Sequence, residues 1–441
     1  MTIVVPALRA AVAPAPWVKN ELWRNAREVP TLDQRFADDK SLVDAISGQQ
    51  LITHTRASAG TYRGSDGLIK TAVTNLLLQS EDFSTTWSTT RASVSANSIA
   101  APNGTLTADT LTADGTTLQH NVAQSASFSA TGDKTYSVFA KAGTNNFMQM
   151  LVGGNVNVYA NFDLSTGTIG DVGTQSTADI ASLGDGWYRC QLTTSQTNPT
   201  SVVIGLVAAS NSIRAESNSL STSIYLWGAQ LEQSSTVGEY IPTTSTINSA
   251  PRFDHDPVTG ECLGLLVEEQ RTNLLLWSEE FDNAAWPPSN SSISPDQTNS
   301  PSASANADLL VESLDVNSTA HSISQLITLA PSTTYTFSIF LKSLGRNAYI
   351  RLDRTGNSGD NIIVSLDLTA GTITSATAGG IATLAGSSIV NFGDGWYRCS
   401  LSGDLGANTD GRVRVFMLDG TSVNYTGDGT SGIYLWGAQF E

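Results

Sequence analysis

The sequence predicts an all-β protein with two tandem jelly-roll or β-sandwich modules, preceded by an extended N-terminal segment and a small β leader. Composition is the first observation behind this prediction: only 14% of the 441 residues are charged, against about 25% in typical globular domains. The second is a long internal repeat. The third is a series of short aromatic and β-branched runs between Gly, Ser and Asn turns, without a helical period.

The repeat consists of strings that occur once in each half of the chain, in the same order. They lie at residues 74–78 and 272–276, 184–190 and 393–399, and 224–230 and 433–439. Trp187 precedes Trp227 by 40 residues, and Trp396 precedes Trp436 by the same number. Each copy is far longer than a solenoid repeat, so we expect each to have its own core and the same strand order.

These strings divide the chain into five segments. In order, they are an N-terminal anchoring segment (1–40), a small β leader (41–73), module 1 (74–232), a connector (233–271) and module 2 (272–441).

Within the modules, residues 136–141 and 335–342 are expected to be strands, and Gly167 and Gly371 to close tight turns. Residues 224–227 are apolar throughout, as in a strand covered on both sides. Residues 187–192 alternate, which places Tyr188, Cys190 and Leu192 on one face and Trp187, Arg189 and Gln191 on the other. We expect Cys190 and Cys399 to be buried.

Short elements are also predicted in the leader and connector. Residues 51–56 are expected to form a strand, and residues 61–63 and 68–70 a hairpin around the turn 64–67. In the connector, residues 256–260 are expected to be a turn before a strand at 263–267.

The N-terminal segment lies outside both copies of the repeat. Below about 40 residues a segment rarely folds unaided, yet this one carries the large apolar side chains of Trp17, Leu22 and Trp23. We therefore expect it to be an anchor that binds a partner protein.

Charge and apolar patterning exclude several functions. A net charge of −17 and a pI near 4.5 oppose nucleic-acid binding. No apolar run reaches the ~18 residues of a membrane span, so membrane insertion is not expected. The apolar N-terminus lacks a preceding basic residue, which makes it a poor signal peptide.

Catalytic and metal-binding patterns are weak, so we expect no enzyme activity, no metal and no cofactor. Asp254, His255 and Asp256 could ligate a metal, but turn formation before Pro257 is the favoured interpretation. Glu268 and Glu269 are adjacent in an expected strand and would point to opposite faces, so they cannot flank one glycosidic bond.

Aromatic residues provide the only positive signal for a ligand. Trp187, Arg189 and Gln191 share a face, as do Trp396, Arg398 and Ser400. If exposed, the indoles could stack on sugars while the polar side chains hold hydroxyls. The alternative is that Trp187 and Trp396 cap the core of each sandwich, and Ser400 in place of Gln191 weakens a shared sugar site.

Strings in the leader and connector, at residues 55–62, 64–70, 251–261 and 264–273, resemble those of tailed-bacteriophage structural proteins. The module strings belong to the same group, described as tail fibre, head fibre or capsid-associated proteins with carbohydrate-binding-like domains. The resemblance covers about residues 40–441 and implies a protein on the virion surface that binds host surface glycans. In that setting, the partner of the anchor at residues 1–40 is expected to be a capsid or tail protein. By analogy, it also implies a homotrimer.

Two departures from this group stand out. Module 1 separates Lys70 from Pro251, where the relatives run the two leader pieces together; this indicates an inserted or duplicated module. Residues 238–242 follow module 1 without a counterpart after Glu441, so either the natural chain ends there or this sequence is shortened. Two rival functions remain: a decoration or adaptor protein that binds no sugar, and a glycan depolymerase, which the lack of a recurring acid pair disfavours.

Overall fold

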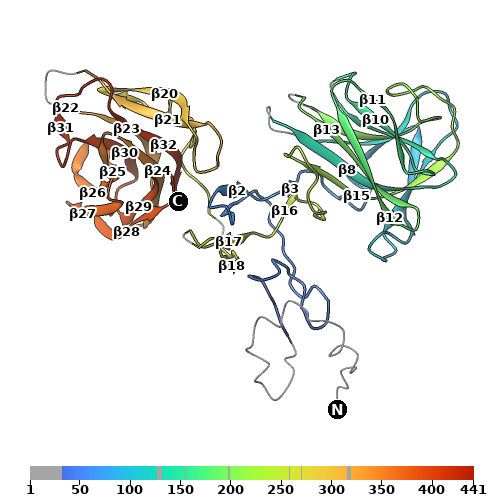
Figure 1. Cartoon of the computed structure of the whole chain (residues 1–441), viewed down its shortest axis with the longest axis horizontal. Helices are drawn as coiled ribbons and strands as arrows, with labels where there is room; N and C mark the ends of the chain where they lie inside the picture. Colours follow the sequence, from blue (N-terminus) through green and yellow to red (C-terminus); the bar gives the residue numbers. More distant parts are fainter. Residues whose placement is uncertain are drawn as a thin grey trace, which may run out of the picture.

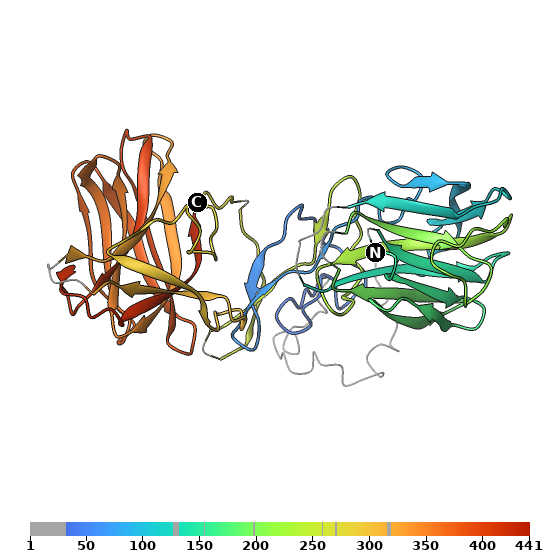
Figure 2. The same cartoon turned by 90° about the horizontal axis from the view of Figure 1, so that it is seen from above.

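In the computed structural model, the regular elements of the described residues are β-strands, as the sequence predicts. The structure describes residues 32–126, 132–153, 155–196, 199–257, 259–269, 271–314 and 319–441. Figure 1 shows two β-sandwiches with small hairpins between them, and Figure 2 shows the layers of each from above. In these ranges no helix is long and apolar enough to cross a membrane. The anchor residues Trp17, Leu22 and Trp23 lie outside the described residues.

Module 1 is a sandwich of two six-stranded antiparallel sheets. The strands of the first sheet are β4 (Ser88–Thr90), β7 (His120–Ser125), β9 (Phe147–Val152), β10 (Tyr159–Asp163), β11 (Thr168–Val172) and β14 (Ser201–Leu206). Those of the second are β5 (Ala92–Ile99), β6 (Ala108–Ala113), β8 (Lys134–Ala142), β12 (Thr177–Gly184), β13 (Trp187–Thr194) and β15 (Ser223–Glu232). The orders are β11-β10-β9-β14-β7-β4 and β12-β13-β8-β15-β6-β5.

Module 2 repeats this architecture. Its first sheet contains β19 (Pro288–Ser289), β23 (Ser322–Thr328), β25 (Asn347–Arg354), β26 (Asn357–Asp367), β27 (Thr372–Gly379) and β30 (Asp410–Leu418). Its second contains β20 (Ser291–Thr298), β21 (Ala307–Glu312), β24 (Tyr335–Leu344), β28 (Thr383–Asn391), β29 (Trp396–Asp404) and β32 (Gly432–Phe440). A short pair, β22 (Thr319–Ala320) and β31 (Asn424–Tyr425), is added at one end.

The strand order of module 2 is the same as that of module 1. Its sheets run β27-β26-β25-β30-β23-β19 and β28-β29-β24-β32-β21-β20, so every strand has a counterpart in the same place. The prediction that both copies of the repeat adopt one fold is therefore confirmed.

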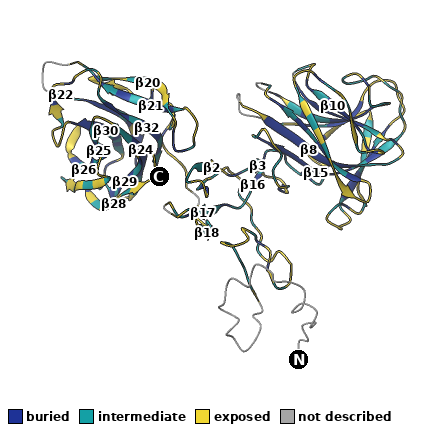
Figure 3. Cartoon of the chain, in the orientation of Figure 1, coloured by how far each residue is buried: buried dark blue, intermediate teal, exposed yellow. Residues whose placement is uncertain are grey.

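Each module has a core between its sheets and a smaller apolar cluster on the outer face of its second sheet. Figure 3 shows the buried strands in the interior of each sandwich. Cys190 and Cys399 lie fully buried in the cores, as predicted. The outer clusters consist of Ala101, Ala108, Phe139, Trp187 and Trp227 in module 1, and of Ala307, Phe340, Trp396 and Trp436 in module 2.

The leader and the connector fold together, although module 1 separates them in the sequence. The predicted leader hairpin is confirmed as β1 (Thr61–Arg63) and β2 (Ile69–Thr71), and the connector contributes β17 (Phe253–His255) and β18 (Cys262–Leu265). Hydrogen bonds join them: the Arg63 amide donates to Asp254 Oδ1 at 2.7 Å, and Arg252 donates to the Thr61 carbonyl at 2.8 Å. We call these four strands the junction unit.

Two local predictions are wrong. Residues 51–56 form no strand, although the Arg56 backbone bonds to Asn248 and Ser249 and His54 also bonds to Ser249. These few contacts do not extend into a ladder of paired residues. β18 ends at Leu265, so Glu268 and Glu269 lie beyond the strand rather than within it. They form ion pairs with different arginines, Arg252 and Arg271, and do not face each other across a site.

Candidate functional site

The two tryptophans predicted to stack on sugars are buried. Trp187 is 4% exposed and Trp396 is 2% exposed, each within the outer cluster of its module. The Trp396 indole N–H donates to the Asn299 carbonyl at 3.0 Å. The exposed indole faces required for sugar stacking are therefore absent, and the sugar-stacking interpretation of these rings is wrong. The alternative holds, because both rings cap apolar clusters.

The arginines that share their strand faces are also engaged within the protein. Arg189 lies over the Phe139 ring at 5.2 Å and donates to the Gly238 carbonyl at 2.8 Å. Burial lowers the pKa of the Arg189 guanidinium, while the Glu232 carboxylate acts in the opposite direction. Such a stacked, hydrogen-bonded guanidinium holds protein parts together.

Arg398 has the same position in module 2. It lies over the Phe340 ring at 5.8 Å and donates to Ser338 Oγ at 3.3 Å and Gln439 Oε1 at 3.2 Å. Burial lowers the pKa of Arg398, opposed by the Glu441 carboxylate. The Gln191 side-chain amide, by contrast, donates to Asp179 Oδ2 at 3.5 Å, and it has no other side-chain hydrogen bond among the described residues. The structure thus does not assemble the predicted residues into an open site.

An open polar pocket lies next to Trp396 instead. It has a volume of about 570 Å³ and belongs to module 2. Its lining residues are Asp296, Gln297, Thr298, Asn299, Ala305, Lys342 and Asp394. Carboxylate, amide and ammonium groups of this kind are the partners that sugar hydroxyls require.

Local backbone features place these side chains. β20 is irregular between Ser294 and Thr298, and Asp296 there has a φ of 56°. The buried Asp308 holds this bulge by accepting the Asp296 amide at 3.0 Å and the Phe281 amide at 2.7 Å. Burial raises the pKa of Asp308, while these two hydrogen bonds lower it. On the other side, Lys342 of β24 lies opposite Trp396 of β29.

The corresponding position in module 1 is less polar. There Ser98, Ile99 and Ala100 stand where module 2 has Gln297, Thr298 and Asn299. The lysine is also engaged, because Lys141 Nζ donates to the Asp185 carbonyl. No hydrogen-bond partner of Lys342 Nζ is found among the described residues. The sequence reasoning missed Asp296 and Gln297 because they lie outside the repeated strings.

The Asp254–His255–Asp256 cluster forms a turn and a strand contact. His255 Nδ1 lies 2.7 Å from the Arg63 carbonyl, and Asp256 Oδ1 accepts the Thr259 amide at 2.8 Å. The turn interpretation is therefore confirmed, closed by the Gly260 amide donating to the Asp256 carbonyl. Within the described ranges, no group of three or more His, Cys, Asp or Glu could hold a metal ion.

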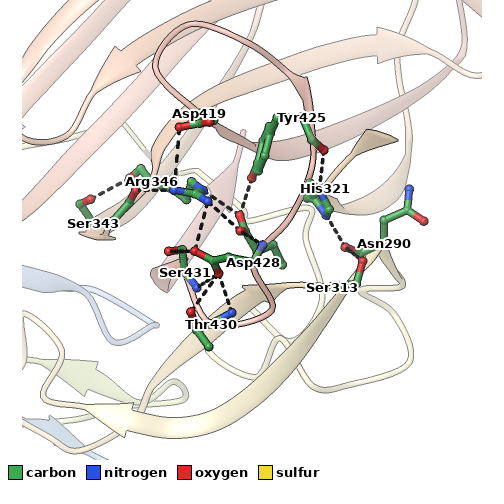
Figure 4. A network of polar contacts seen from close by, with 12 residues as sticks. Asn290, Ser313, His321, Ser343, Arg346, Asp419, Tyr425, Asp428, Thr430 and Ser431 are labelled. Atoms are coloured by element: carbon green, nitrogen blue, oxygen red, sulfur yellow. Dashed lines mark hydrogen bonds and ion pairs between the residues drawn. The ribbon is translucent and has the colours of Figure 1, made fainter. Parts of the chain in front are cut away.

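A second polar cluster, shown in Figure 4, is closed rather than open. Glu312 is 1% exposed and accepts two bonds of 2.7 Å from Arg346, one of 2.8 Å from the Tyr425 hydroxyl and one of 2.7 Å from the Asp428 amide. We interpret this cluster as a structural tie that fastens the loop before β32.

Comparisons with known proteins add little. No protein-family model matches the chain, and no curated protein sequence matches it. Among solved structures, the chain is similar to the tandem CBM22-1–CBM22-2 domain of Paenibacillus barcinonensis Xyn10C, with 12% identity and a TM-score of 0.30, over 87% of this chain and 99% of that one. Hazelnut (Corylus avellana) vicilin gives 8% identity and a TM-score of 0.12, over 76% and 83%. Superpositions this poor carry no functional argument, so the architecture rests on the strand orders above.

Proposed function

We propose that this chain is a non-catalytic structural protein of a tailed-bacteriophage virion, and that module 2 binds host surface glycans through its polar pocket. One observation carries the glycan part: an open pocket of about 570 Å³ lined by carboxylates, amides and an ammonium group. The virion part is supported by the resemblance of residues 55–70 and 251–273, which join in the junction unit.

Assembly completes the proposal. Residues 1–40, with Trp17, Leu22 and Trp23, bind a capsid or tail protein, and the modules project from the virion surface. Several copies on one particle, arranged as homotrimers, would convert weak glycan contacts into strong adhesion through avidity.

The glycan part is tested by screening the full chain against a glycan array and measuring any hit by isothermal titration. We expect the double variant Gln297→Ala, Lys342→Ala to lose at least tenfold in affinity. Lys141→Ala is the matched control in module 1 and should bind as the wild type does. If every variant binds equally, the pocket is not the site. If no glycan binds, the protein is a decoration or adaptor.

The virion part is tested by truncation. A chain that starts at Ser41 should fold but should not assemble onto phage particles, as measured by quantitative blotting of purified virions. Incorporation at the wild-type copy number would place the anchor elsewhere.

A further inference from the structure

The outer face of the first sheet of module 2 carries three arginines on its two neighbouring strands β25 and β30 (Figure 1). Arg351 of β25 lies opposite Arg414 of β30, and Arg412 lies two residues before Arg414 on the same side of that strand. The side chains of Arg351, Arg414 and Arg412 are 13%, 20% and 25% exposed. We call this cluster the arginine face. Its charge is opposite to the net charge of −17 on the whole chain.

One carboxylate, that of Asp353, forms ion pairs with all three arginines. Asp353 is fully buried beneath them. Arg412 Nη2 donates to Asp353 Oδ2 at 2.9 Å. Asp353 Oδ1 lies 3.2 Å from Arg414 Nε and 3.8 Å from Arg351 Nε. Three guanidinium groups around one carboxylate leave two positive charges in excess.

The guanidinium groups also retain hydrogen-bond donors, since each of them has several N–H groups. Among the described residues, the buried Arg412 Nε has no hydrogen-bond partner. Arg414 lies over the Phe416 ring at 5.6 Å, and beyond its ion pair with Asp353 no side-chain hydrogen bond of Arg414 is found in the described part of the chain. The cluster therefore has both the charge and the donors to bind an oxyanion.

A fourth arginine, Arg354, lies at the edge of this face and is neutralised within the chain. Its guanidinium is 3.8 Å from Asp360 Oδ2 and 3.9 Å from Asp410 Oδ1. Two carboxylates thus balance this one arginine. It adds no excess positive charge and provides a matched control for the other three.

The fold does not require these charges, because module 1 has none of them. The strands β9 and β14 pair as β25 and β30 do, which fixes the equivalent positions. The positions of Arg351, Asp353, Arg412 and Arg414 are occupied in module 1 by Leu151, Gly153, Ser201 and Val203. The same sandwich therefore forms with uncharged residues there, and the arginine face is specific to module 2.

The side chains around the arginines favour a saccharide over a protein as the ligand. Ser324 of β23 lies opposite Arg414 on one side, and Asn361 and Thr377 follow on β26 and β27 on the other. Hydroxyl and amide groups of this kind bind sugar hydroxyls. Leu326 adds an exposed apolar side chain at the rim. The centre of this face is charged, whereas a protein interface is depleted of charge at its centre.

We propose that the arginine face binds the anionic group, a carboxylate or a phosphate, of an acidic saccharide. Guanidinium forks on adjacent strands hold such an oxyanion by paired, charge-assisted hydrogen bonds. The choice of a saccharide rests on the proposed function. The site itself is separate, because it lies on the first sheet of module 2, whereas the polar pocket is lined by β20 and β24 of the second sheet.

The binding test is isothermal titration of the full chain with a carboxylated probe, trigalacturonate, and a phosphorylated one, mannose 6-phosphate. At least one of them should bind at least tenfold more tightly than its neutral counterpart, galactotriose or mannose. The affinity should fall as salt is added, because salt screens the charges. Comparison of the two anionic probes shows which oxyanion the site prefers.

Substitutions then locate the site. Arg414→Gln and Arg412→Gln should each weaken binding of the anionic probe at least tenfold, and Arg414→Lys should restore part of it by restoring the charge without the fork. Arg354→Gln is the control and should bind as the wild type does. Arg414→Gln leaves Asp353 two arginine partners, and an unchanged melting temperature by calorimetry shows that the variant is folded.

Three results would overturn the proposal. The first is that neither anionic probe binds the folded chain at millimolar concentration. The second is that Arg414→Gln binds as tightly as the wild type, or that the double variant Gln297→Ala, Lys342→Ala loses the binding instead, which would assign the acidic saccharide to the polar pocket and support the proposed function alone. The third is that a hexaglutamate peptide binds as tightly and is lost equally in Arg414→Gln, since the ligand is then an acidic protein segment.

Discussion

Modules 1 and 2 share one strand order but close their outer faces in different ways. In module 1, the segment 238–244, which we call the strap, covers this face, and its Tyr240 meets Phe139 edge-on at 5.6 Å and 82°. In module 2, Phe392 meets the equivalent Phe340 edge-on at 4.9 Å and 89°, and Arg63 of the junction unit lies 3.8 Å over Phe392. The counterpart of Phe392 in module 1 is Leu183, which is 48% exposed.

The two copies of the repeat therefore share the residues of the outer cluster but differ in the residues that cover it. The repeated strings supply the two tryptophans of each outer cluster and the arginine beside it, while residues outside those strings supply its cover. One duplicated sandwich therefore presents two different outer faces. The buried polar interior differs as well: Glu312 of module 2 stands where module 1 has Ala113.

The largest effect on stability is expected from replacing Glu312 of module 2 by the alanine that module 1 has at the equivalent position. Glu312→Ala removes the buried carboxylate that pairs with the 13%-exposed Arg346 guanidinium and accepts the Asp428 amide. Of its ion pairs, Arg346 then keeps only the longer contacts to Asp428 at 3.4 Å and Asp419 at 3.9 Å. Breaking a buried pair in this way costs about 3–5 kcal/mol. Differential scanning calorimetry should show a much lower melting temperature for the transition of module 2 and an unchanged one for that of module 1.

Asp419→Ala is the control for that variant. It removes a 3.9 Å contact to the same arginine from a side chain that is 61% exposed, and a pair of this kind contributes at most about 1 kcal/mol. If both variants lower the melting temperature of module 2 equally, the Glu312 cluster does not stabilise the module more than a surface ion pair does.

A smaller effect should separate Gln230, which bonds to the strap in module 1, from Gln439, which has the equivalent position in module 2. Gln230→Ala removes the partner of the Ile241 amide inside module 1 and should cost about 1–3 kcal/mol, the penalty for an unsatisfied buried group. Among the described residues, the Gln439 side chain bonds to Arg398 and Glu441, so Gln439→Ala should cost less than about 1 kcal/mol. Urea unfolding of both variants measures the difference. Equal costs would mean that the strap adds nothing to module 1.

The smallest effect concerns pH. The Ser431 hydroxyl, with the Ser431 and Thr430 amides, holds the pKa of Asp428 well below its usual value of 3.8. A lowered folded-state pKa contributes stability above the unfolded value, and that contribution is lost as pH falls through the folded one. At pH 6, module 2 of the wild type should therefore melt at a higher temperature than module 2 of the Asp428→Asn variant. The difference between the two melting temperatures should shrink below pH 3.8. A difference independent of pH would contradict the assignment.

Several features could be predicted from sequence because their causes are local. Strand alternation over residues 187–192, the turns at Gly167 and Gly260, and burial of Cys190 depend on neighbouring residues and on the two-residue period of a strand. The shared fold of the modules followed from repeated strings at matched spacing. The failed strand at residues 51–56 marks the limit of this reasoning, since a strand also needs an edge to pair with.

The tertiary structure decided which faces remain open. Alternation correctly put Trp187 and Arg189 on the outer face of a sheet, but the strap and the outer cluster, distant in sequence, cover that face. In the same way, Arg63 and His255 are in direct contact, although the whole of module 1 separates them in the sequence. The polar pocket combines Asp394 of a repeated string with Lys342 and with Asp296 and Gln297 of the β20 bulge, which are distant in sequence. Local patterns determine which side of a strand a residue occupies, whereas its exposure depends on long-range contacts between segments that the pattern does not encode.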